Sequence, residues 1–110
     1  MKRIVCVVMA ALSVGASAST AAEPSPERVR ELVRMVRQDC GSCHGMTLNG
    51  GLGPALTAEA LKVRDVPKAA LVATIVGGRP GTPMPPWHRF VSEAEADWIV
   101  DRLLEGFPAQ

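Results

Sequence analysis

Cys40-Gly41-Ser42-Cys43-His44 is the stretch of this 110-residue sequence that decides its fold. Two cysteines three positions apart, followed at once by a histidine, are typical of covalent haem c attachment, in which each thiol forms a thioether with the porphyrin. The histidine then lies where its imidazole can bind the iron. We therefore predict that Cys40 and Cys43 attach one haem c and that His44 is the proximal iron ligand.

Two other kinds of site also use paired cysteines. A thiol–disulfide active site contains C-x-x-C but needs no histidine directly after it. A structural zinc site needs a second pair of ligands, and the third cysteine of the sequence, Cys6, lies in a segment that we expect to be removed. Haem attachment is the favoured interpretation, and a thiol–disulfide oxidoreductase is the remote alternative.

The N-terminal residues have the features of an export signal. Lys2 and Arg3 precede a short apolar run at residues 4–12, and small residues follow, with an A-x-A cleavage site at residues 16–18 and a second option at residues 20–22. The apolar run is far too short to cross a bilayer core of about 30 Å. We expect residues 1–18, or up to residue 22, to be a cleaved signal peptide. Residues 23–110 then form one periplasmic domain without stable membrane insertion, and a retained anchor is the alternative.

The charge balance argues against a nucleic-acid-binding protein. The chain has 12 Lys and Arg against 11 Asp and Glu, and removal of Lys2 and Arg3 leaves 10 against 11. The arginines are spread among acidic residues and form no basic patch. A domain this short has a small core, so we expect the haem to serve as the apolar centre around which the chain packs.

The pattern of the remaining residues predicts an all-α domain. Ser25 and Pro26 begin a helix whose apolar residues recur at i, i+3, i+4 and i+7 as far as Cys40. Residues 41–54 are expected to be loop, because glycines punctuate them. A short helix is expected at residues 58–63, and a second one, capped by Asp65, before the glycines at 77 and 78. A capping box at residues 92–95 should open a last helix that extends to Leu104.

Met84 lies in a segment that prolines make rigid. They occupy positions 80, 83, 85 and 86, which excludes both helix and sheet. A stiff loop can hold a weakly binding thioether on an iron, and Met/His ligation raises the reduction potential. We predict that Met84 is the distal iron ligand. It could instead fill a gap in an apolar wall, and His88 is a candidate ligand if the loop rearranges.

Pro54 is a candidate support for the proximal histidine. Ligating imidazoles normally donate their second N–H to a carbonyl or carboxylate oxygen. The carbonyl of Pro54, ten residues after His44, is free to accept such a hydrogen bond in a rigid segment. An ordinary loop turn would have the same spacing.

Residues 40–44, Gly53-Pro54-Ala55-Leu56, Met84-Pro85-Pro86 and the capped last helix together resemble the class I c-type cytochrome family. The resemblance covers nearly the whole domain after the signal peptide. It implies an all-α class I cytochrome c fold, a small helical domain wrapped around one covalent haem. It also implies that Met84 is the distal ligand and that the Pro54 carbonyl supports the proximal histidine.

More narrowly, residues 50–57, 78–87 and 105–108 resemble the NirC-type cytochromes. These are small periplasmic monohaem proteins encoded with the cytochrome cd1 nitrite reductase of denitrifying bacteria. The resemblance implies a carrier and not an enzyme, with that reductase as the expected redox partner. A part in maturing or inserting the d1 haem of the reductase is the alternative. Because a six-coordinate His/Met iron has no open position for substrate, we expect outer-sphere electron transfer.

Overall fold

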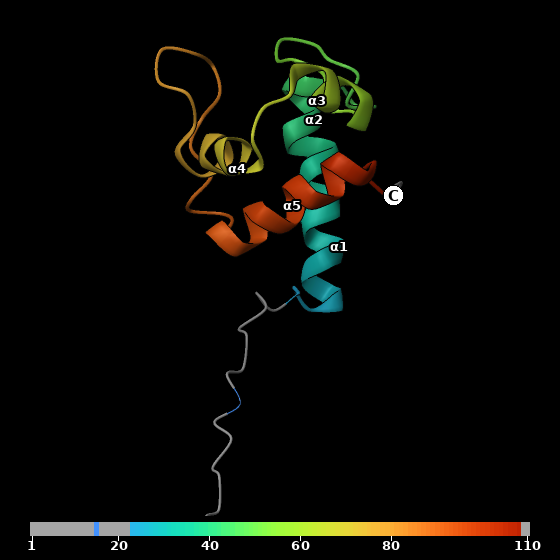
Figure 1. The fold of residues 1–110 in the computed structure, drawn as a ribbon, viewed down its shortest axis with the longest axis vertical. Coiled ribbons are helices and arrows are strands. Elements are labelled where there is room, and N and C mark those ends of the chain that lie inside the picture. The colour runs from blue at the N-terminus through green and yellow to red at the C-terminus, as the bar shows by residue number, and fades with distance from the viewer. Residues whose placement is uncertain (1–14, 16–22, 109–110) are drawn as a thin grey trace, which may run out of the picture.

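The computed structural model describes residue 15 and residues 23–108, so the expected signal peptide apart from residue 15, and both candidate cleavage sites, lie outside the described residues. The described part of the chain is helical and has no strand, which confirms the all-α prediction (Figure 1). Its elements are α1 (Pro26–Met35), the π-helical turn η1 (Val36–Cys40), α2 (Gly41–His44), α3 (Ala58–Arg64), α4 (Lys68–Gly77) and α5 (Glu93–Glu105). None of the helices formed by residues 23–108 combines the length and the apolar character needed to cross a membrane.

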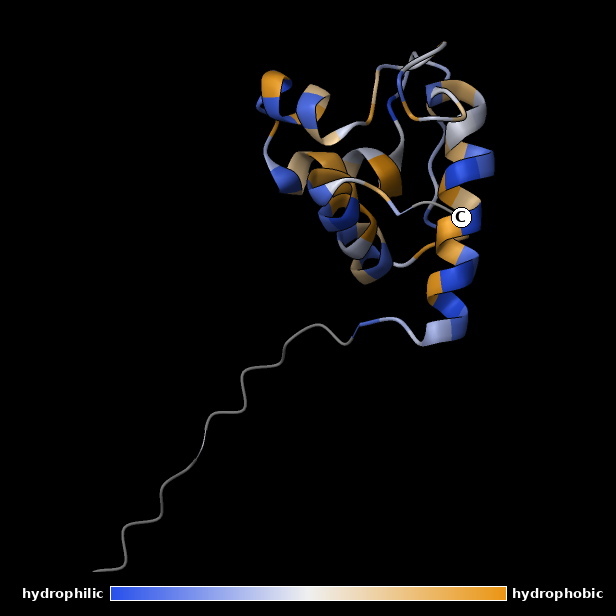
Figure 2. Ribbon diagram, turned by 90° about the vertical axis from the view of Figure 1, so that its right-hand side faces the viewer, coloured by the Kyte–Doolittle hydropathy of each residue, from blue (hydrophilic) through white to orange (hydrophobic). Residues whose placement is uncertain are grey.

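The helices are arranged around one continuous column. α1, η1 and α2 follow one another along it, and α5 crosses it while packing against α4 and α3 (Figure 1). Figure 2 shows that α1 is polar over much of its surface, with apolar residues between the polar ones. Leu32 and Val36 belong to these apolar residues and are fully buried, as is Val100 of α5. The core therefore lies where α5 meets the column, as the spacing of the apolar residues predicts.

Side-chain caps begin three of the helices. Ser25 Oγ accepts a hydrogen bond from the backbone N–H of Arg28 at 3.2 Å, and Thr57 Oγ1 accepts one from Ala60 at 3.2 Å. At the start of α5, Ser92 Oγ accepts from the Glu95 N–H, and the Glu95 carboxylate accepts from the Ser92 N–H. This arrangement confirms the predicted capping box.

The prediction that residues 41–54 are entirely loop is wrong at its beginning. The first helix does not end at Gly41, because the Gly41 N–H continues the hydrogen-bond ladder to the carbonyls of Gln38 and Val36. The helical path breaks instead at Gly45, whose φ of 91° favours glycine. The haem-attachment motif is therefore held on a helical turn.

The predicted cap at Asp65 is also wrong. Asp65 ends α3 in the left-handed conformation, with φ of 49°, and its N–H donates to the carbonyls of Leu61 and Lys62. Pro67 stands directly before α4, where its fixed φ suits the residue preceding a helix. Asp65 can adopt this conformation because aspartate tolerates it better than most residues.

The proline-rich segment between α4 and α5 is non-helical, as predicted, and reaches away from the helices in Figure 1. Its far end is tied back to α4. Trp87 donates its backbone N–H to the Ile75 carbonyl at 2.9 Å, and His88 donates to Val76 at 3.3 Å. The segment is thus a loop that is fixed at both ends on the same helix.

Arg28 joins the first and last helices. Its Nε and Nη2 donate to the two carboxylate oxygens of Glu95 at 3.0 and 2.8 Å, and Nη2 also donates to the Phe90 carbonyl at 2.7 Å. Hydrogen bonding to Arg28 is the main cause of the lowered pKa of Glu95. Because Glu95 also belongs to the capping box, one carboxylate serves both the start of α5 and its attachment to α1.

Arg28→Ala should lower the free energy of unfolding by about 1–2 kcal/mol at neutral pH, since it removes a two-pronged ion pair that is mostly shielded from solvent. Arg34→Ala, an exposed arginine of the same helix, is the control and should change it by less than about 0.5 kcal/mol. Denaturant unfolding checks both. Because the folded pKa of Glu95 lies below its ordinary value of about 4.5, the contribution of the pair is complete above that pH. It is lost as pH falls through the folded pKa. If the difference in unfolding free energy between the wild type and Arg28→Ala stays constant on acidification, the ion pair with Glu95 is not its cause.

Candidate cofactor site

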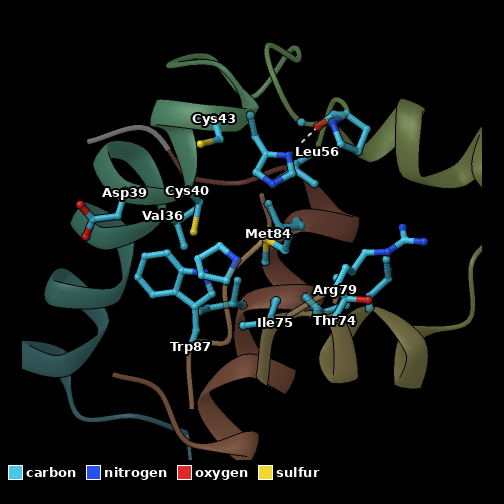
Figure 3. A pocket seen from close by; sticks show the side chains of 18 of the residues that line it. Val36, Asp39, Cys40, Cys43, Leu56, Thr74, Ile75, Arg79, Met84 and Trp87 are labelled. Carbon is cyan, nitrogen blue, oxygen red and sulfur yellow. Dashed lines mark hydrogen bonds between the residues drawn. The ribbon is translucent and has the colours of Figure 1, made fainter. Parts of the chain in front are cut away.

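One cavity of about 550 Å³ lies between the helical column, α4 and the proline-rich loop (Figure 3). Its volume is in the range of about 300–1,000 Å³ that is typical of cofactor and ligand sites. Its walls are mainly apolar and include Val36, Leu56, Leu71, Ile75, Trp87, Val100 and Leu103. Cys40, Cys43, His44, Pro54 and Met84 also line it, so the structure brings all five predicted site residues to one place.

Cys40 and Cys43 line the cavity from the helical turn formed by η1 and α2. A spacing of three residues places both side chains on the same face of a helix, and both thiols are free. Burial, together with the negative charge of Asp39, raises the pKa of the Cys40 thiol to about 11. A thiol–disulfide enzyme needs the opposite shift, so the site does not favour that alternative.

The imidazole of His44 has a defined orientation. Its Nδ1 lies 2.7 Å from the Pro54 carbonyl oxygen, the contact drawn as a dashed line in Figure 3. Because a carbonyl can only accept, Nδ1 must carry the proton and donate it. The tautomer then leaves Nε2 with a free lone pair, which is the form of histidine that binds metals.

Gly53 packs its backbone directly against this imidazole. A Cβ atom at position 53 would lie 2.7 Å from His44 Cε1 and 2.8 Å from Nδ1, closer than real contacts allow. Analysis of the sequence missed this role, although the glycine directly before Pro54 was the available signal. The His44 ring is therefore held between a hydrogen bond and a backbone surface that only glycine provides.

Met84 lines the cavity from the proline-rich loop, and Figure 3 shows its side chain directed into the same space as those of Cys40 and Cys43. Its backbone is fixed on both sides. The Met84 N–H donates to Thr82 Oγ1 at 3.3 Å, and its carbonyl accepts from the Arg79 N–H at 3.1 Å. The thioether is thus presented by a loop with its own internal hydrogen bonds.

Gly78 lets this loop turn back on itself. Its φ of 66° favours glycine, and a Cβ there would lie 2.7 Å from the carbonyl carbon of Pro85 and 2.8 Å from the Met84 carbonyl oxygen. The sequence indicated Gly78 as the end of a helix, but the close approach to the residues around Met84 depends on tertiary structure.

The alternative iron ligand, His88, is exposed and is not among the residues that line the cavity. Met46, the methionine nearest to His44 in sequence, is 64% exposed and also lies outside it. His44 lines the cavity from α2 and Met84 lines it from the proline-rich loop, so the two predicted iron ligands come from different elements.

The residues present fit a haem c. The two thiols lie on one helical face, which suits two thioether bonds. The imidazole with its free Nε2 and the thioether of Met84 would suit the two axial positions of the iron, and the apolar walls would suit the porphyrin faces. Among the described residues, no three or more His, Cys, Asp or Glu side chains lie together in a way that could hold a metal ion by themselves. The chemistry that the site supports best is therefore that of a bound haem.

Comparisons with known proteins agree with this geometry. The family described as "Cytochrome C oxidase, cbb3-type, subunit III" matches residues 27–101. Cytochrome c55X of Pseudomonas aeruginosa is 58% identical over 83 residues, which are 76% of this chain and 68% of that protein. Among solved structures, the c-type cytochrome NirC has a TM-score of 0.71 and 56% identity, over 74% of this chain and 94% of that one. Dihydro-heme d1 dehydrogenase NirN in complex with DHE has a TM-score of 0.59 and 34% identity, over 70% of this chain but only 16% of that one.

Gly53→Ala should displace the His44 imidazole, because the added methyl group would overlap the ring. In the haem-loaded reduced protein, we expect the Nδ1 proton of His44 to exchange with solvent roughly fivefold faster, equivalent to about 1 kcal/mol of lost hydrogen bonding. NMR of that proton is the measurement. Gly77→Ala is the matched control, since a Cβ at position 77 meets nothing within 4 Å. Equal exchange rates in the wild type and Gly53→Ala would contradict the packing role.

Proposed function

The chain belongs to the c-type cytochrome family of the c55X and NirC kind, and from this premise we propose that it carries single electrons to a cytochrome cd1 nitrite reductase in the periplasm. It is a monohaem cytochrome with the class I cytochrome c fold and one covalently bound haem c, an electron carrier and not an enzyme. Residues 1–18, or up to residue 22, would be the signal peptide that exports it, and residues 23–110 would be the working domain.

The observation that carries the proposal is that His44 and Met84 line one apolar cavity together with the two cysteines. Cys40 and Cys43 would hold the cofactor through thioethers, His44 would bind the iron through Nε2, and Met84 would bind it through sulfur. The haem, when bound, supplies one iron that alternates between the ferric and ferrous states. If both residues bind the iron, no position would be left for a substrate, as expected of an electron carrier and not of an enzyme.

The residues around the two ligands would set the properties of the carrier. A thioether is a soft ligand that favours ferrous iron, so Met84 would raise the reduction potential. The Pro54 carbonyl would fix the orientation and increase the basicity of His44. The apolar wall around them would exclude water and lower the local dielectric constant. His44 lies on the helical turn α2, and Met84 lies on a loop that backbone hydrogen bonds hold, so neither ligand would need to move when the electron is transferred.

Met84→Ala should abolish the sulfur-to-iron charge-transfer band of the ferric protein and lower its reduction potential. The alanine removes the thioether and leaves a weaker ligand, such as water, in its place. Absorption spectra and redox titration of protein matured with covalent haem are the measurements. Met46→Ala, at an exposed methionine outside the cavity, is the matched control and should leave both unchanged. If the band survives in Met84→Ala, a different sulfur holds the iron, whereas a wild type without the band would point to a nitrogen ligand such as His88.

The proposed partner is supported by the likeness to NirC, which covers 94% of that protein. The residues beside Met84 would allow the close approach that outer-sphere transfer needs. Gly81, Pro83 and Pro85 are exposed and add little side-chain bulk where the loop borders the cavity. Electron-transfer complexes of this kind bury small areas and dissociate quickly.

A second candidate function is a role in maturing or inserting d1 haem. The observation that favours it is the likeness to the NirN structure, a dihydro-heme d1 dehydrogenase with DHE bound. This chain matches 16% of that protein, which is the extent of a single cytochrome domain and leaves most of NirN without a counterpart here. A maturation factor would bind its partner or a d1 haem precursor without competent electron exchange, whereas a carrier would pass its electron to the reductase.

Rapid mixing of the reduced cytochrome with oxidised cytochrome cd1 nitrite reductase distinguishes the two functions. We expect the cytochrome to be oxidised within the mixing experiment, in a reaction whose rate falls as salt increases if charged side chains guide the encounter. The Met84→Ala protein, with its lower potential, should change the position of the equilibrium. Binding to the reductase, or to d1 haem precursors, without electron exchange would favour the maturation role.

A further inference from the structure

The cavity is mainly apolar, and the few charged or titratable side chains that line it are not evenly distributed. The charged and titratable side chains that line it are Asp39, Cys40, Cys43, His44, Arg64 and Arg79. Those from residues 39–44 lie on the helical column. Arg79 lies on the other side, next to Thr74 of α4, and Figure 3 shows the Cys40 and Arg79 side chains on opposite sides of the cavity.

The Arg79 guanidinium has no hydrogen bond or salt bridge to any other residue in the described part of the chain, residues 23–108. The polar side chains beside it already have partners. Thr74 Oγ1 donates to the Ala70 carbonyl at 2.8 Å, and Thr82 Oγ1 donates to the Arg79 carbonyl at 2.7 Å. Arg64, the other arginine of the lining, donates through Nη2 to the Ala55 carbonyl at 3.0 Å. The unused donors at this side of the cavity are therefore mainly those of Arg79.

We propose that Arg79 binds a propionate carboxylate of the haem, an inference that rests on the haem c site proposed above. In haem c the two thioether bonds are on one edge of the porphyrin and the two carboxylates are on the opposite edge. If Cys40 and Cys43 hold the thioether edge at the helical column, the carboxylate edge faces α4 and the loop after it. Arg79 is the fully unpaired cation on that side.

The chemistry of the two groups fits this pairing. A carboxylate beside an apolar wall loses hydration and needs a charged donor to compensate. The planar guanidinium can donate two parallel hydrogen bonds to the two oxygens of one carboxylate, which a lysine ammonium cannot do. Asp39, the acidic side chain of the lining, lies on the column beside Cys40 and so does not compete for Arg79.

Arg79 would then connect the carboxylate to the distal ligand. Its backbone N–H donates to the Met84 carbonyl, and its own carbonyl accepts from the Thr82 N–H at 3.1 Å and from Thr82 Oγ1. The same residue thus closes the loop that presents the thioether and places a positive charge beside the cofactor. Because that charge offsets the carboxylate, it disfavours the ferric state and raises the reduction potential.

The test uses the haem-loaded protein in the wild type and in Arg79→Gln, Arg79→Lys and Arg64→Gln variants. Arg89→Gln is the matched control, since Arg89 is an exposed arginine of the same segment and does not line the cavity. The readouts are the infrared bands of the haem carboxylates, the reduction potential and the sulfur-to-iron charge-transfer band. For Arg79→Gln we expect shifted carboxylate bands and a retained charge-transfer band. We also expect an equilibrium constant for reduction about threefold lower, which is a decrease in the reduction potential of ~28 mV at 59 mV per tenfold for one electron.

The variants separate charge from geometry. Arg79→Lys should keep most of the potential but still shift the carboxylate bands, because it keeps the charge and loses the two-pronged hydrogen bond. Arg89→Gln should match the wild type in all three readouts. A purely structural role of Arg79 in the loop would change the charge-transfer band and leave the carboxylate bands unchanged.

Two outcomes would overturn the proposal. If Arg79→Gln has the same carboxylate bands and the same reduction potential as the wild type, Arg79 is a solvated charge. Bands that shift in Arg64→Gln but not in Arg79→Gln would assign the carboxylate to Arg64. Failure of the haem site itself has a different signature, because the wild type would then lack covalent haem or the charge-transfer band before any arginine is changed.

Discussion

The orientation of the His44 imidazole is the constraint on which the rest of the site depends. The ring donates to the Pro54 carbonyl and rests on the backbone of Gly53. The loop reaches this position by satisfying the end of α2. Its N–H groups at Gly50 and Gly53 donate to the carbonyls of His44 and Cys43 at 2.7 and 2.8 Å, which a helix end would otherwise leave unpaired. The residues that end the helix therefore also place the acceptor for the histidine that the helix carries.

The hydrophobic core and the cavity are built from the same side chains. Val36, Ile99, Val100 and Leu103 are buried in the core and also line the cavity. A chain of this length can bury only a limited apolar surface. Because the same side chains pack the helices together and would contact the cofactor, the free energies of folding and of cofactor binding are linked. The link reaches Met84 as well, because Trp87 packs against the core and its backbone holds the proline-rich loop on α4.

The sequence predicted those features that local spacing determines. The capping box of α5 and the rigid loop of Met84 each depend on residues a few positions apart, and the structure contains both. Features that depend on tertiary contacts could not be read in the same way. The Arg28–Glu95 pair joins residues 67 positions apart, and the need for glycine at position 53 is visible only once the imidazole lies against it. The continuation of the helix past Gly41 was missed because glycine is a weak helix former, and the adjoining turns of η1 and α2 outweigh that preference.

The physical character of the site separates electron transfer from thiol chemistry, although both start from a C-x-x-C pair. Reactive thiols lie in polar, positively charged surroundings that stabilise the thiolate, whereas burial raises the pKa of Cys40 to about 11. The other contacts limit motion: Pro54 holds the His44 imidazole, and Thr82 with Arg79 holds the loop that carries Met84. A carrier benefits from such rigidity, because ligands that stay in place in both oxidation states keep the structural cost of each transfer small. Fold and cofactor follow from these residues, whereas the choice of partner depends on the surface around the cavity mouth. Proteins that share this domain, such as NirC and NirN, can therefore differ in function while keeping a similar fold.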